Sequence, residues 1–389
     1  MDITIHPGKL AGCVTAIPSK SQAHRLLICA AFAKGETKLH CPETNEDIEA
    51  TAACLNALGA KITRHSWGYH IGPVENYPAE AVLPVNESGS TLRFLLPVAG
   101  ALGVKTTFQL RGRLPQRPLS PLWEELERMG CQLSRPTEGT ILLTGKLRSG
   151  EYRIDGSVSS QFISGLLFAT AIMDGESTVT VTGNVESRPY IDMTLKALAL
   201  FSKDGSLVSP GEITVEGDWS NGAFFLAAKT LESDVTVQNL DENSSQGDRA
   251  CAHWFEALNK RQTISAKDIP DLVPILSVVA AAKEGAVFTD IRRLRAKESD
   301  RVESVKNMLS ALGIESASDE NTLTVYPGCF QGGTVDSCND HRIAMAAAIA
   351  ATIASGPVKV LGAQCVKKSY PSFWEEYKKL GGKYELYLW

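Results

Sequence analysis

One local pattern occurs six times along this chain and constrains its fold more than any other feature. A short polar cluster is followed each time by a run rich in Leu, Ala, Phe and Ile. The clusters lie at residues 19–21, 87–90, 159–161, 218–221, 268–271 and 339–342. Ser, Asp and Asn are favoured helix caps, so each cluster predicts the start of a buried helix. Six such helices at similar spacing predict a fold built from repeats.

The segments between these helices predict the rest of the repeat. Alternating sequences predict strands at 179–182, 213–215, 235–237 and 323–326, and charged amphipathic stretches predict outer helices at 48–58, 122–129, 193–201 and 302–312. Gly59, Gly130 and Gly313 follow three of the outer helices, as helix stops commonly do. The unit is therefore strand, buried helix, strand, outer helix, strand. Three units can close around their buried helices, so six predict two α/β domains.

The weakest joint in the pattern lies near Val215-Glu216-Gly217-Asp218, between the third and fourth units. A chain that leaves one domain early and returns late would also cross near Ile17-Pro18. We therefore expect a first domain of residues 1–17 plus 217–389 and a second of residues 18–216. The hinge crossings are expected near 17–18 and 216–218.

Composition excludes several classes of protein. Among 389 residues, 43% are hydrophobic and 21% charged, which is ordinary for a globular protein. No run approaches the length of a membrane span, and a net charge of −5 argues against a nucleic-acid partner. The nine Cys lack a CxxC spacing and the seven His lack an HExxH motif, so we expect no metal and reduced thiols in a cytoplasmic protein.

Basic residues gather at or near the repeated helix starts: Lys20, Arg25, Arg93, Lys297, Arg301 and Arg342. A helix start presents free N–H groups and partial positive charge, which suit phosphate or carboxylate. A locally basic cleft on an acidic protein predicts a small, highly anionic substrate.

Two segments admit more than one interpretation. Lys297 and Arg301 are spaced to share a helical face, which fits either an anion site or an exposed, salt-bridged helix. Asp271 sits within an apolar stretch, where a carboxylate is either a helix cap or a partly desolvated base.

Taken together, the polar segments resemble the 5-enolpyruvylshikimate-3-phosphate synthase family. The matching motifs are Ser19-Lys20-Ser21 with His24-Arg25, Arg117-Pro118, Ser159-Ser160-Gln161-Phe162, the stretch from Ser187 to Thr194, Glu216-Gly217-Asp218, Lys297-Glu298-Ser299-Asp300-Arg301, Asp340-His341-Arg342 and Lys368-Ser369-Tyr370-Pro371. They occur in order over essentially the whole chain. The resemblance implies a two-domain inside-out α/β barrel, each domain having three βαβαββ units around buried parallel helices. It also implies that the first domain contains both chain ends.

The resemblance further implies a transferase of aromatic amino acid biosynthesis, in the shikimate pathway. Such an enzyme moves the enolpyruvyl group of phosphoenolpyruvate to the 5-hydroxyl of shikimate 3-phosphate by addition and elimination, and releases phosphate. The implied catalytic residues are Lys20, Asp271 and Glu298. Those implied for shikimate 3-phosphate are Ser21, Arg25, Ser159, Ser160, Gln161, Ser187, Tyr190, Asp271 and Lys297. Those implied for phosphoenolpyruvate are Lys20, Gly89, Arg117, Gln161, Arg301, Arg342 and Lys368. We expect a monomer without cofactor, metal, nucleic acid or membrane partner.

The chain departs from the family pattern at two positions: Glu87 and Arg293 each stand where the family commonly has Asn. Their charges suggest that Glu87 pairs with Arg293 or Arg117. Two alternative functions remain at this point. One is the related enolpyruvyl transfer to UDP-N-acetylglucosamine, and the other is non-catalytic binding of a phosphometabolite.

Overall fold

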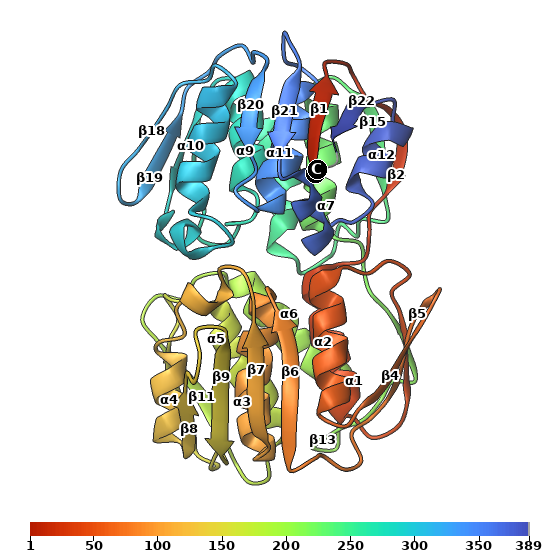
Figure 1. Cartoon of the computed structure of the whole chain (residues 1–389), viewed down its shortest axis with the longest axis vertical. Coiled ribbons are helices and arrows are strands. Elements are labelled where there is room, and N and C mark those ends of the chain that lie inside the picture. Colours follow the sequence, from red (N-terminus) through yellow and green to blue (C-terminus); the bar gives the residue numbers. More distant parts are fainter. Residues whose placement is uncertain (388–389) are drawn as a thin grey trace. The chain divides into compact units, whose positions relative to one another are not determined.

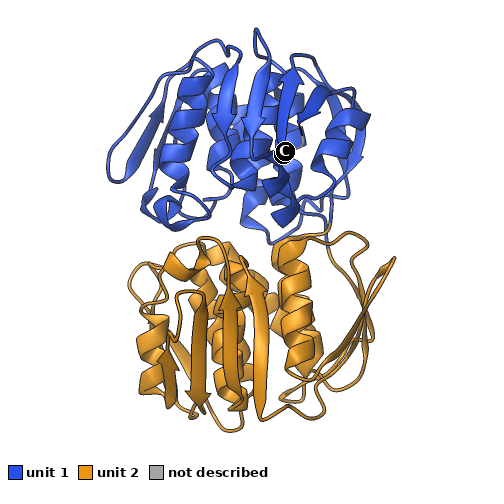
Figure 2. Ribbon diagram, in the orientation of Figure 1, with its two compact units in different colours: residues 1–17, 216–389 blue, residues 18–215 orange. Residues whose placement is uncertain are grey.

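The computed structural model describes residues 1–387, which fold into two compact units (Figures 1 and 2). Unit 1 comprises residues 1–17 and 216–389, and unit 2 comprises residues 18–215.

Unit 2 contains six helices, one short 3-10 turn and three principal sheets. The helical segments are α1 (Lys20–Phe32), α2 (Glu46–Ala57), α3 (Gly89–Leu102), η1 (Leu114–Gln116), α4 (Leu122–Arg128), α5 (Ser160–Ile172) and α6 (Arg188–Phe201). The strands are β3 (Thr37–His40), β4 (Lys61–His65), β5 (Gly68–Gly72), β6 (Glu80–Asn86), β7 (Lys105–Leu110), β8 (Cys131–Ser134), β9 (Thr140–Gly145), β10 (Glu151–Asp155), β11 (Thr178–Thr182), β12 (Ser202–Lys203), β13 (Ser206–Leu207) and β14 (Glu212–Thr214). The sheet orders are β14-β3-β5-β4, β6-β7-β9-β8 and β10-β11.

The described part of unit 1 has the same kind of architecture. Its helical segments are α7 (Trp219–Thr230), η2 (Gly247–Ala250), α8 (Cys251–Ala257), α9 (Val273–Ala282), η3 (Arg292–Ala296), α10 (Arg301–Ala311), α11 (His341–Ala351), η4 (Ala363–Lys368) and α12 (Phe373–Lys379). Its strands are β1 (Asp2–His6), β2 (Ala11–Thr15), β15 (Asp234–Gln238), β16 (Gln262–Ser265), β17 (Ala286–Thr289), β18 (Ser316–Ser318), β19 (Thr322–Val325), β20 (Gly333–Asp336), β21 (Val358–Leu361) and β22 (Lys383–Tyr387). The sheet orders are β20-β21-β1-β22, β16-β17-β19-β18 and β15-β2.

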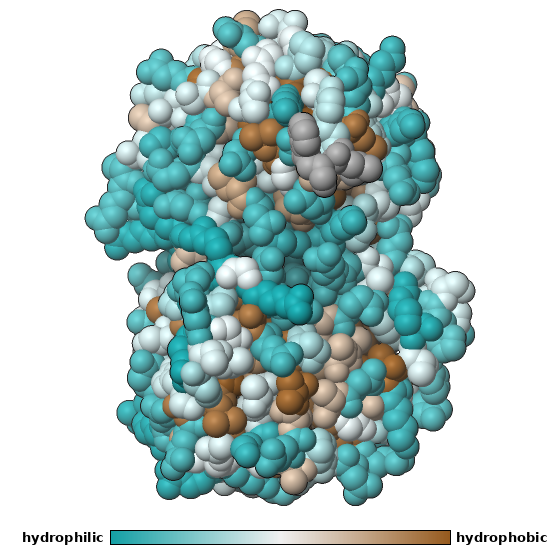
Figure 3. Space-filling model, in the orientation of Figure 1, coloured by the Kyte–Doolittle hydropathy of each residue, from teal (hydrophilic) through white to brown (hydrophobic). Residues whose placement is uncertain are grey.

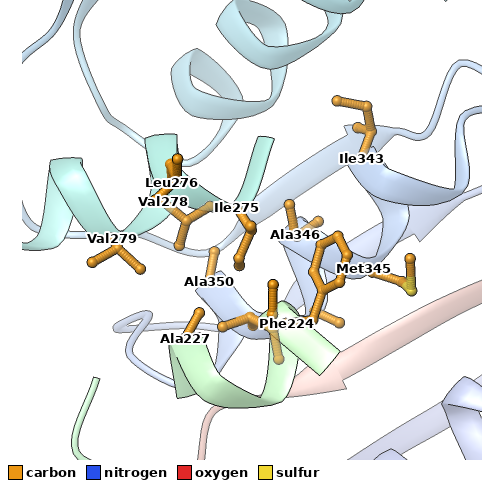
Figure 4. Close-up of a cluster of buried hydrophobic side chains, with 14 of the residues drawn as sticks. Phe224, Ala227, Ile275, Leu276, Val278, Val279, Ile343, Met345, Ala346 and Ala350 are labelled. Carbon is orange, nitrogen blue, oxygen red and sulfur yellow. The ribbon is translucent and has the colours of Figure 1, made fainter. Parts of the chain in front are cut away.

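Mostly buried helices form the core of each unit: α1, α3 and α5 in unit 2, and α7, α9 and α11 in unit 1. In unit 1, α7, α9 and α11 pack on one another, and every residue of α11 is buried. Figure 4 shows Phe224 of α7, Ile275 of α9 and Ala346 of α11 meeting in this core. The small Ala side chains of α11 permit close approach of its neighbours. Each fully buried Ile or Phe stabilises the fold by about 1.5–3 kcal/mol.

The helix starts expected from the sequence are confirmed, with one exception. Side chains of Ser19, Ser88, Ser159, Asp218 and Asp340 cap α1, α3, α5, α7 and α11. Helix α9 instead begins after Leu272 and has no side-chain cap, so the interpretation of Asp271 as a helix cap is wrong.

The six repeats are not equal. In the third repeat, strands β12 and β13 have two residues each and pair only with one another. In the fourth repeat, α8 is followed by residues 258–261 and then directly by β16, the first strand of the next repeat. As a result, the sheets β10-β11 and β15-β2 have two strands where the other four sheets have four. The regular repeat expected from the sequence is thus shortened on both sides of the joint between the third and fourth repeats.

Over residues 1–387, no helix is both long enough and apolar enough to cross a membrane. The face drawn in Figure 3 is largely hydrophilic, with small separated apolar spots.

Candidate active site

In unit 2, the first turn of α1 holds Lys20 beside a carboxylate. The Ser19 hydroxyl oxygen accepts a hydrogen bond from the Gln22 amide at 3.4 Å, which fixes the start of the helix. Lys20 Nζ lies 3.1 Å from Asp47 Oδ2 in the first turn of α2, and both side chains are largely buried. Lys20 is therefore held in place by its own counter-charge.

Arg25, one turn further along α1, joins this helix to α6. Its guanidinium donates to Thr194 Oγ1 at 2.8 Å, to the Tyr190 carbonyl at 2.8 Å and to the Ser21 carbonyl at 2.6 Å. Burial lowers the pKa of Arg25 to about 10, so the side chain remains cationic at neutral pH. The predicted residues Ser21, Arg25 and Tyr190 are thus brought together.

The starts of α3 and α5 are also joined by side chains. Arg93 Nη1 donates to Gln161 Oε1 at 2.7 Å, and Gln161 Nε2 donates to Ser90 Oγ at 2.9 Å. Gly89 lies against two guanidinium groups, because a Cβ atom there would come 2.7 Å from Arg117 Nη1 and 3.1 Å from Arg93 Nη1. Any larger residue at position 89 would displace these cations from the start of α3.

The Ser residues predicted for shikimate 3-phosphate lie at the starts of α5 and α6. Ser159 caps α5 by accepting from the Gln161 amide at 3.3 Å, and Ser160 is the first residue of that helix. Ser187 precedes α6 with a φ of +55°, in the left-handed region that a residue with a Cβ rarely adopts. Ser159, Ser160 and Ser187 are all buried. Strain at Ser187 is consistent with a functional requirement for that backbone shape.

In unit 1, one fully buried guanidinium contacts three carboxylates. Arg301 donates from Nη1 to Asp271 Oδ1 at 2.7 Å, from Nη2 to Glu298 Oε2 at 2.7 Å and from Nε to Asp340 Oδ2 at 3.0 Å. Burial alone would lower the pKa of Arg301, but these carboxylates raise it above its ordinary value. We use the name ion cluster for Asp271, Lys297, Glu298, Arg301, Asp340 and Arg342.

Asp271 is the point where the cations of this cluster meet. Besides Arg301, it is approached by Lys297 Nζ at 3.4 Å and Arg342 Nη2 at 3.3 Å. Burial acts to raise the pKa of Asp271, but Arg342, Lys297 and Arg301 together hold it well below its usual range. Burial also lowers the pKa of Lys297, an effect that Asp271 opposes. Asp271 is therefore ionised, and its role as a base remains a prediction.

The prediction that Lys297 and Arg301 share a helical face is wrong. Lys297 ends the 3-10 turn η3 in an extended conformation, and Asp300 caps a new helix that begins at Arg301. The cap is visible in the sequence as Asp300 followed three residues later by Glu303, whose amide donates to Asp300 Oδ1 at 3.2 Å. The exposed-helix alternative is wrong as well, because Arg301 is completely buried.

Lys368 lies near the start of α11. Its Nζ donates to the Asn339 carbonyl at 3.1 Å, and Asn339 and the preceding Cys338 both have positive φ angles, +55° and +51°. The next residue, Ser369, exchanges hydrogen bonds with Asn221 in the first turn of α7. Lys368, the last residue of η4, is thus part of the polar region of unit 1.

Sequence reasoning did not assign roles to several polar residues that contact the predicted ones. These are Asp47, Ser90 and Ser299, which contact Lys20, Gln161 and Asp340. Asn45 can be recognised in the sequence as the cap of α2, and this cap could have indicated that Asp47, two residues later, lies in the first turn of a helix. Glu87 stands where the family commonly has Asn, and its carboxylate lies against the backbone of Gly112. Its pairing with Arg293 or Arg117 remains a prediction.

Comparisons with known proteins identify the family of this chain. A sequence profile of the family EPSP synthase (3-phosphoshikimate 1-carboxyvinyltransferase) matches residues 5–377. A 3-phosphoshikimate 1-carboxyvinyltransferase of Clostridium kluyveri is 37% identical over an alignment of 416 positions, covering 98% of this chain and 97% of the relative. One of Clostridium beijerinckii is 36% identical, covering 99% and 98%.

A solved structure of EPSP synthase from Acinetobacter baumannii matches this fold with a TM-score of 0.78 at 24% identity, covering 99% of this chain and 100% of that chain. The expected two-domain inside-out α/β barrel is confirmed by this likeness. The chain belongs to the EPSP synthase family.

Proposed function

We propose that this protein transfers the enolpyruvyl group of phosphoenolpyruvate to the 5-hydroxyl of shikimate 3-phosphate and releases phosphate. Its family membership supports this transferase activity in aromatic amino acid biosynthesis. The observation that carries the proposal at the level of atoms is the ion cluster, in which one ionised carboxylate is surrounded by three cations. We also propose that the protein acts as a monomer in the cytoplasm, as its sequence suggests.

In this proposal each substrate is held by the residues that the family resemblance implies for it. Shikimate 3-phosphate binds through Ser21, Arg25, Ser159, Ser160, Gln161, Ser187, Tyr190, Asp271 and Lys297. Phosphoenolpyruvate binds through Lys20, Gly89, Arg117, Gln161, Arg301, Arg342 and Lys368. Charge-assisted hydrogen bonds from Arg and Lys are stronger than the few tenths of a kcal/mol that a single helix start offers.

Asp271 acts as the base that accepts the proton of the 5-hydroxyl. In the free protein its three cations make it a weak base, because they stabilise the ionised form. When an anionic substrate takes up donors of Arg342 and Lys297, Asp271 loses part of that stabilisation and becomes more basic. The base is thus strengthened at the moment that the substrate is bound.

The remaining steps move one proton onto and off the methylene carbon. As the 5-oxygen bonds to C2 of phosphoenolpyruvate, C3 gains a proton, and a tetrahedral adduct forms. Loss of a proton from C3 then accompanies cleavage of the bond between C2 and the phosphate oxygen, which restores the double bond. Lys20 and Glu298 serve these transfers at C3 and at the leaving phosphate, and general acid–base groups of this kind contribute about 10²–10⁴-fold in rate.

The test is phosphate release measured with both substrates, with each alone, and with UDP-N-acetylglucosamine in place of shikimate 3-phosphate. We expect release only with shikimate 3-phosphate and phosphoenolpyruvate together, and a product whose mass equals the sum of the substrates minus phosphoric acid. Lys20→Met and Glu298→Gln should each lose turnover by about 10²-fold or more with a nearly unchanged melting temperature. The matched control is Lys196→Met, at an exposed residue of α6.

Two results would contradict the proposal. Turnover with UDP-N-acetylglucosamine would assign the chain to the related sugar reaction. Tight binding of both anions without phosphate release would make it a binding protein.

A further inference from the structure

The buried titratable side chains that the proposed reaction does not use include Asp248 and His24. Asp248 lies in η2, and its Oδ2 accepts a hydrogen bond from Ser220 Oγ at 2.5 Å in the first turn of α7. His24 lies in α1 and is fully buried. Hydrogen bonds lead from His24 to the residues that form the candidate site of unit 2, so its surroundings suggest a role.

Three hydrogen bonds join His24 to the start of α3. His24 Nδ1 lies 2.7 Å from Thr51 Oγ1 on α2, and Thr51 Oγ1 lies 2.6 Å from Thr91 Oγ1 on α3. Thr91 Oγ1 donates in turn to Ser88 Oγ, the cap of that helix, at 2.7 Å. We use the name His24 network for His24, Thr51, Thr91 and Ser88, all of which are buried.

The His24 network has a definite direction. Each hydroxyl group has one hydrogen, so Thr91, which donates to Ser88, must accept from Thr51. Thr51 must then accept from His24 Nδ1. Burial holds the pKa of His24 well below its ordinary value, so the ring is neutral and its single proton lies on Nδ1. In agreement, Nε2 is buried and has no hydrogen-bond partner among residues 1–387.

One end of the His24 network lies beside Lys20. Lys20 precedes His24 by four residues on α1, so the two side chains leave the same face of that helix. Lys20 Nζ is held 3.1 Å from Asp47 Oδ2, and the Asp47 carbonyl oxygen lies 3.5 Å from Thr91 Oγ1. The network therefore adjoins both Lys20 and its counter-charge.

The other end of the His24 network is the cap of α3. The Ser88 hydroxyl oxygen accepts from the Thr91 amide at 3.3 Å as well as from the Thr91 hydroxyl. Gly89, the first residue of α3, follows Ser88 directly. Helix α2 packs on both α1 and α3 and carries Thr51 between them. The network thus ties the start of α3 to α1.

We propose that the His24 network positions Lys20 and Gly89 relative to one another for phosphoenolpyruvate. Its members His24, Thr51 and Thr91 are positioning residues, which act through the starts of α1 and α3. Without the network, the start of α3 shifts against α1, and the backbone at Gly89 no longer meets the anion that Lys20 binds. The inference rests on the proposed function, which assigns Lys20 and Gly89 to phosphoenolpyruvate.

A purely structural role of these hydrogen bonds predicts a different result. Loss of a buried hydrogen bond lowers stability, and a less stable enzyme has a smaller folded fraction. The apparent kcat then falls, but the KM values of the molecules that remain folded do not change. Misplaced groups instead weaken the binding of one substrate, and a small misplacement can cost as much as about 10²-fold in rate. The KM for phosphoenolpyruvate therefore separates the two explanations.

The experiment compares the wild type with Thr51→Val and with the control Thr106→Val. Valine has nearly the shape and helix propensity of threonine but no hydroxyl. Thr106 in β7 is equally buried, and its hydroxyl donates to the Val104 carbonyl at 2.9 Å. For Thr51→Val we expect the KM for phosphoenolpyruvate to rise about fivefold, with the KM for shikimate 3-phosphate within about twofold of the wild type. The control should change neither KM, and Thr51→Ser, which keeps the hydroxyl, should restore the wild-type value.

A double variant tests whether the His24 network acts as a unit. Thr91→Val breaks the network at its next member and should also raise the KM for phosphoenolpyruvate about fivefold. Residues of one hydrogen-bond network are not additive, so the double variant should show a rise close to that of one single variant. Independent contributions would instead multiply to a rise of about 25-fold.

An unchanged KM for phosphoenolpyruvate in folded Thr51→Val would overturn the inference while leaving the proposed function intact. A multiplied rise in the double variant would overturn it as well. A wild type without turnover would overturn both the inference and the proposed function. If Thr51→Val does not fold, as judged by circular dichroism and thermal melting, Thr91→Val compared with Thr91→Ser decides the matter by the same criterion.

Discussion

The two units meet the demands of an anionic substrate in different ways. In unit 1, the cations of the ion cluster are neutralised by the protein's own carboxylates, and Arg301 alone contacts three of them. In unit 2, the buried groups at the helix starts are mostly neutral, as in Ser159, Ser160 and Ser187, and Arg25 donates to a hydroxyl and to backbone carbonyls. In unit 1 the titratable groups thus form one cluster, whereas in unit 2 the ion pair of Lys20 and Asp47 stands beside mostly neutral donors.

This difference suggests a division of labour. Proton transfer needs groups whose charge can change, and such groups can be buried only with partners of opposite charge. Anchoring a phosphate needs donors in fixed positions, which capped helix starts supply without a buried charge. Substitutions of the cations of the ion cluster should thus affect chemistry and stability together, whereas substitutions of the neutral donors of unit 2 should affect mainly binding.

The largest expected effect contrasts Asp271→Asn with Ser160→Ala. Asp271→Asn removes the proposed base and should lower kcat by about 10²–10⁴-fold. Ser160→Ala removes one hydrogen bond to a charged group, worth about 1.5–3 kcal/mol, and should raise the KM for shikimate 3-phosphate with little change in kcat. Steady-state kinetics with each substrate varied in turn gives both values. A large loss of kcat in Ser160→Ala with an unchanged KM would contradict the division.

The second contrast concerns stability, and compares Arg301→Met with Arg25→Met. Loss of Arg301 leaves Asp271, Glu298 and Asp340 without their shared cation, and should cost about 3–5 kcal/mol in the free energy of unfolding. Loss of Arg25 leaves neutral acceptors, so we expect a cost of about 1–3 kcal/mol.

Urea unfolding followed by circular dichroism measures both changes. Arg188→Met serves as the control, because Arg188 makes an exposed pair with Asp192 that should be worth less than about 1 kcal/mol. Equal losses for Arg301→Met and Arg25→Met would show that the charge of the partners does not matter here.

Much of the fold could be predicted from local pattern. The caps at Ser19, Ser159 and Asp340, and the stop at Gly313, depend on short-range chemistry that a single sequence displays. The shortening of the third and fourth repeats could not be predicted in the same way. Whether β12 and β13 join the sheet β10-β11 depends on strand pairing, which is a long-range property.

The candidate site was harder to predict for the same reason. Lys297 and Arg301 have helical spacing, but Asp300 caps a helix between them, and this local signal outweighs the spacing. Asp248 lies 23 residues before Asp271 in the sequence, in an unremarkable polar loop. Only the tertiary packing of α7, η2 and α11 shows that the charges of Arg342 and Asp271 act on it.

The smallest effect concerns acid sensitivity, where His24 of unit 2 and Asp248 of unit 1 should differ in sign. In unit 2, burial and the nearby Lys20 and Arg25 hold the pKa of His24 well below its ordinary value, so the folded protein keeps this imidazole neutral. Below about pH 6.5, His24 binds a proton in the unfolded chain but not in the folded chain. The free energy of unfolding therefore falls by up to about 1.4 kcal/mol for each unit by which the pH is lowered. In unit 1, the pKa of Asp248 is raised to about 6. Between about pH 6 and the ordinary pKa of an aspartate, lowering the pH therefore favours the folded state, because the folded chain binds the proton first.

His24→Asn should therefore flatten the dependence of the unfolding free energy on pH between about pH 5 and 6.5, whatever it does to stability at neutral pH. Urea unfolding at several pH values gives this slope, which is independent of the hydrogen bond to Thr51 that the substitution also alters. His253→Asn, at an exposed position on α8, serves as the control and should leave the slope unchanged. The folded protein keeps the buried His24 imidazole unprotonated, and His24→Asn changes the pH slope of the unfolding free energy only by removing this effect. An unaltered slope would therefore mean that the folded protein also protonates His24. The contrast between the units would then be confined to their carboxylates.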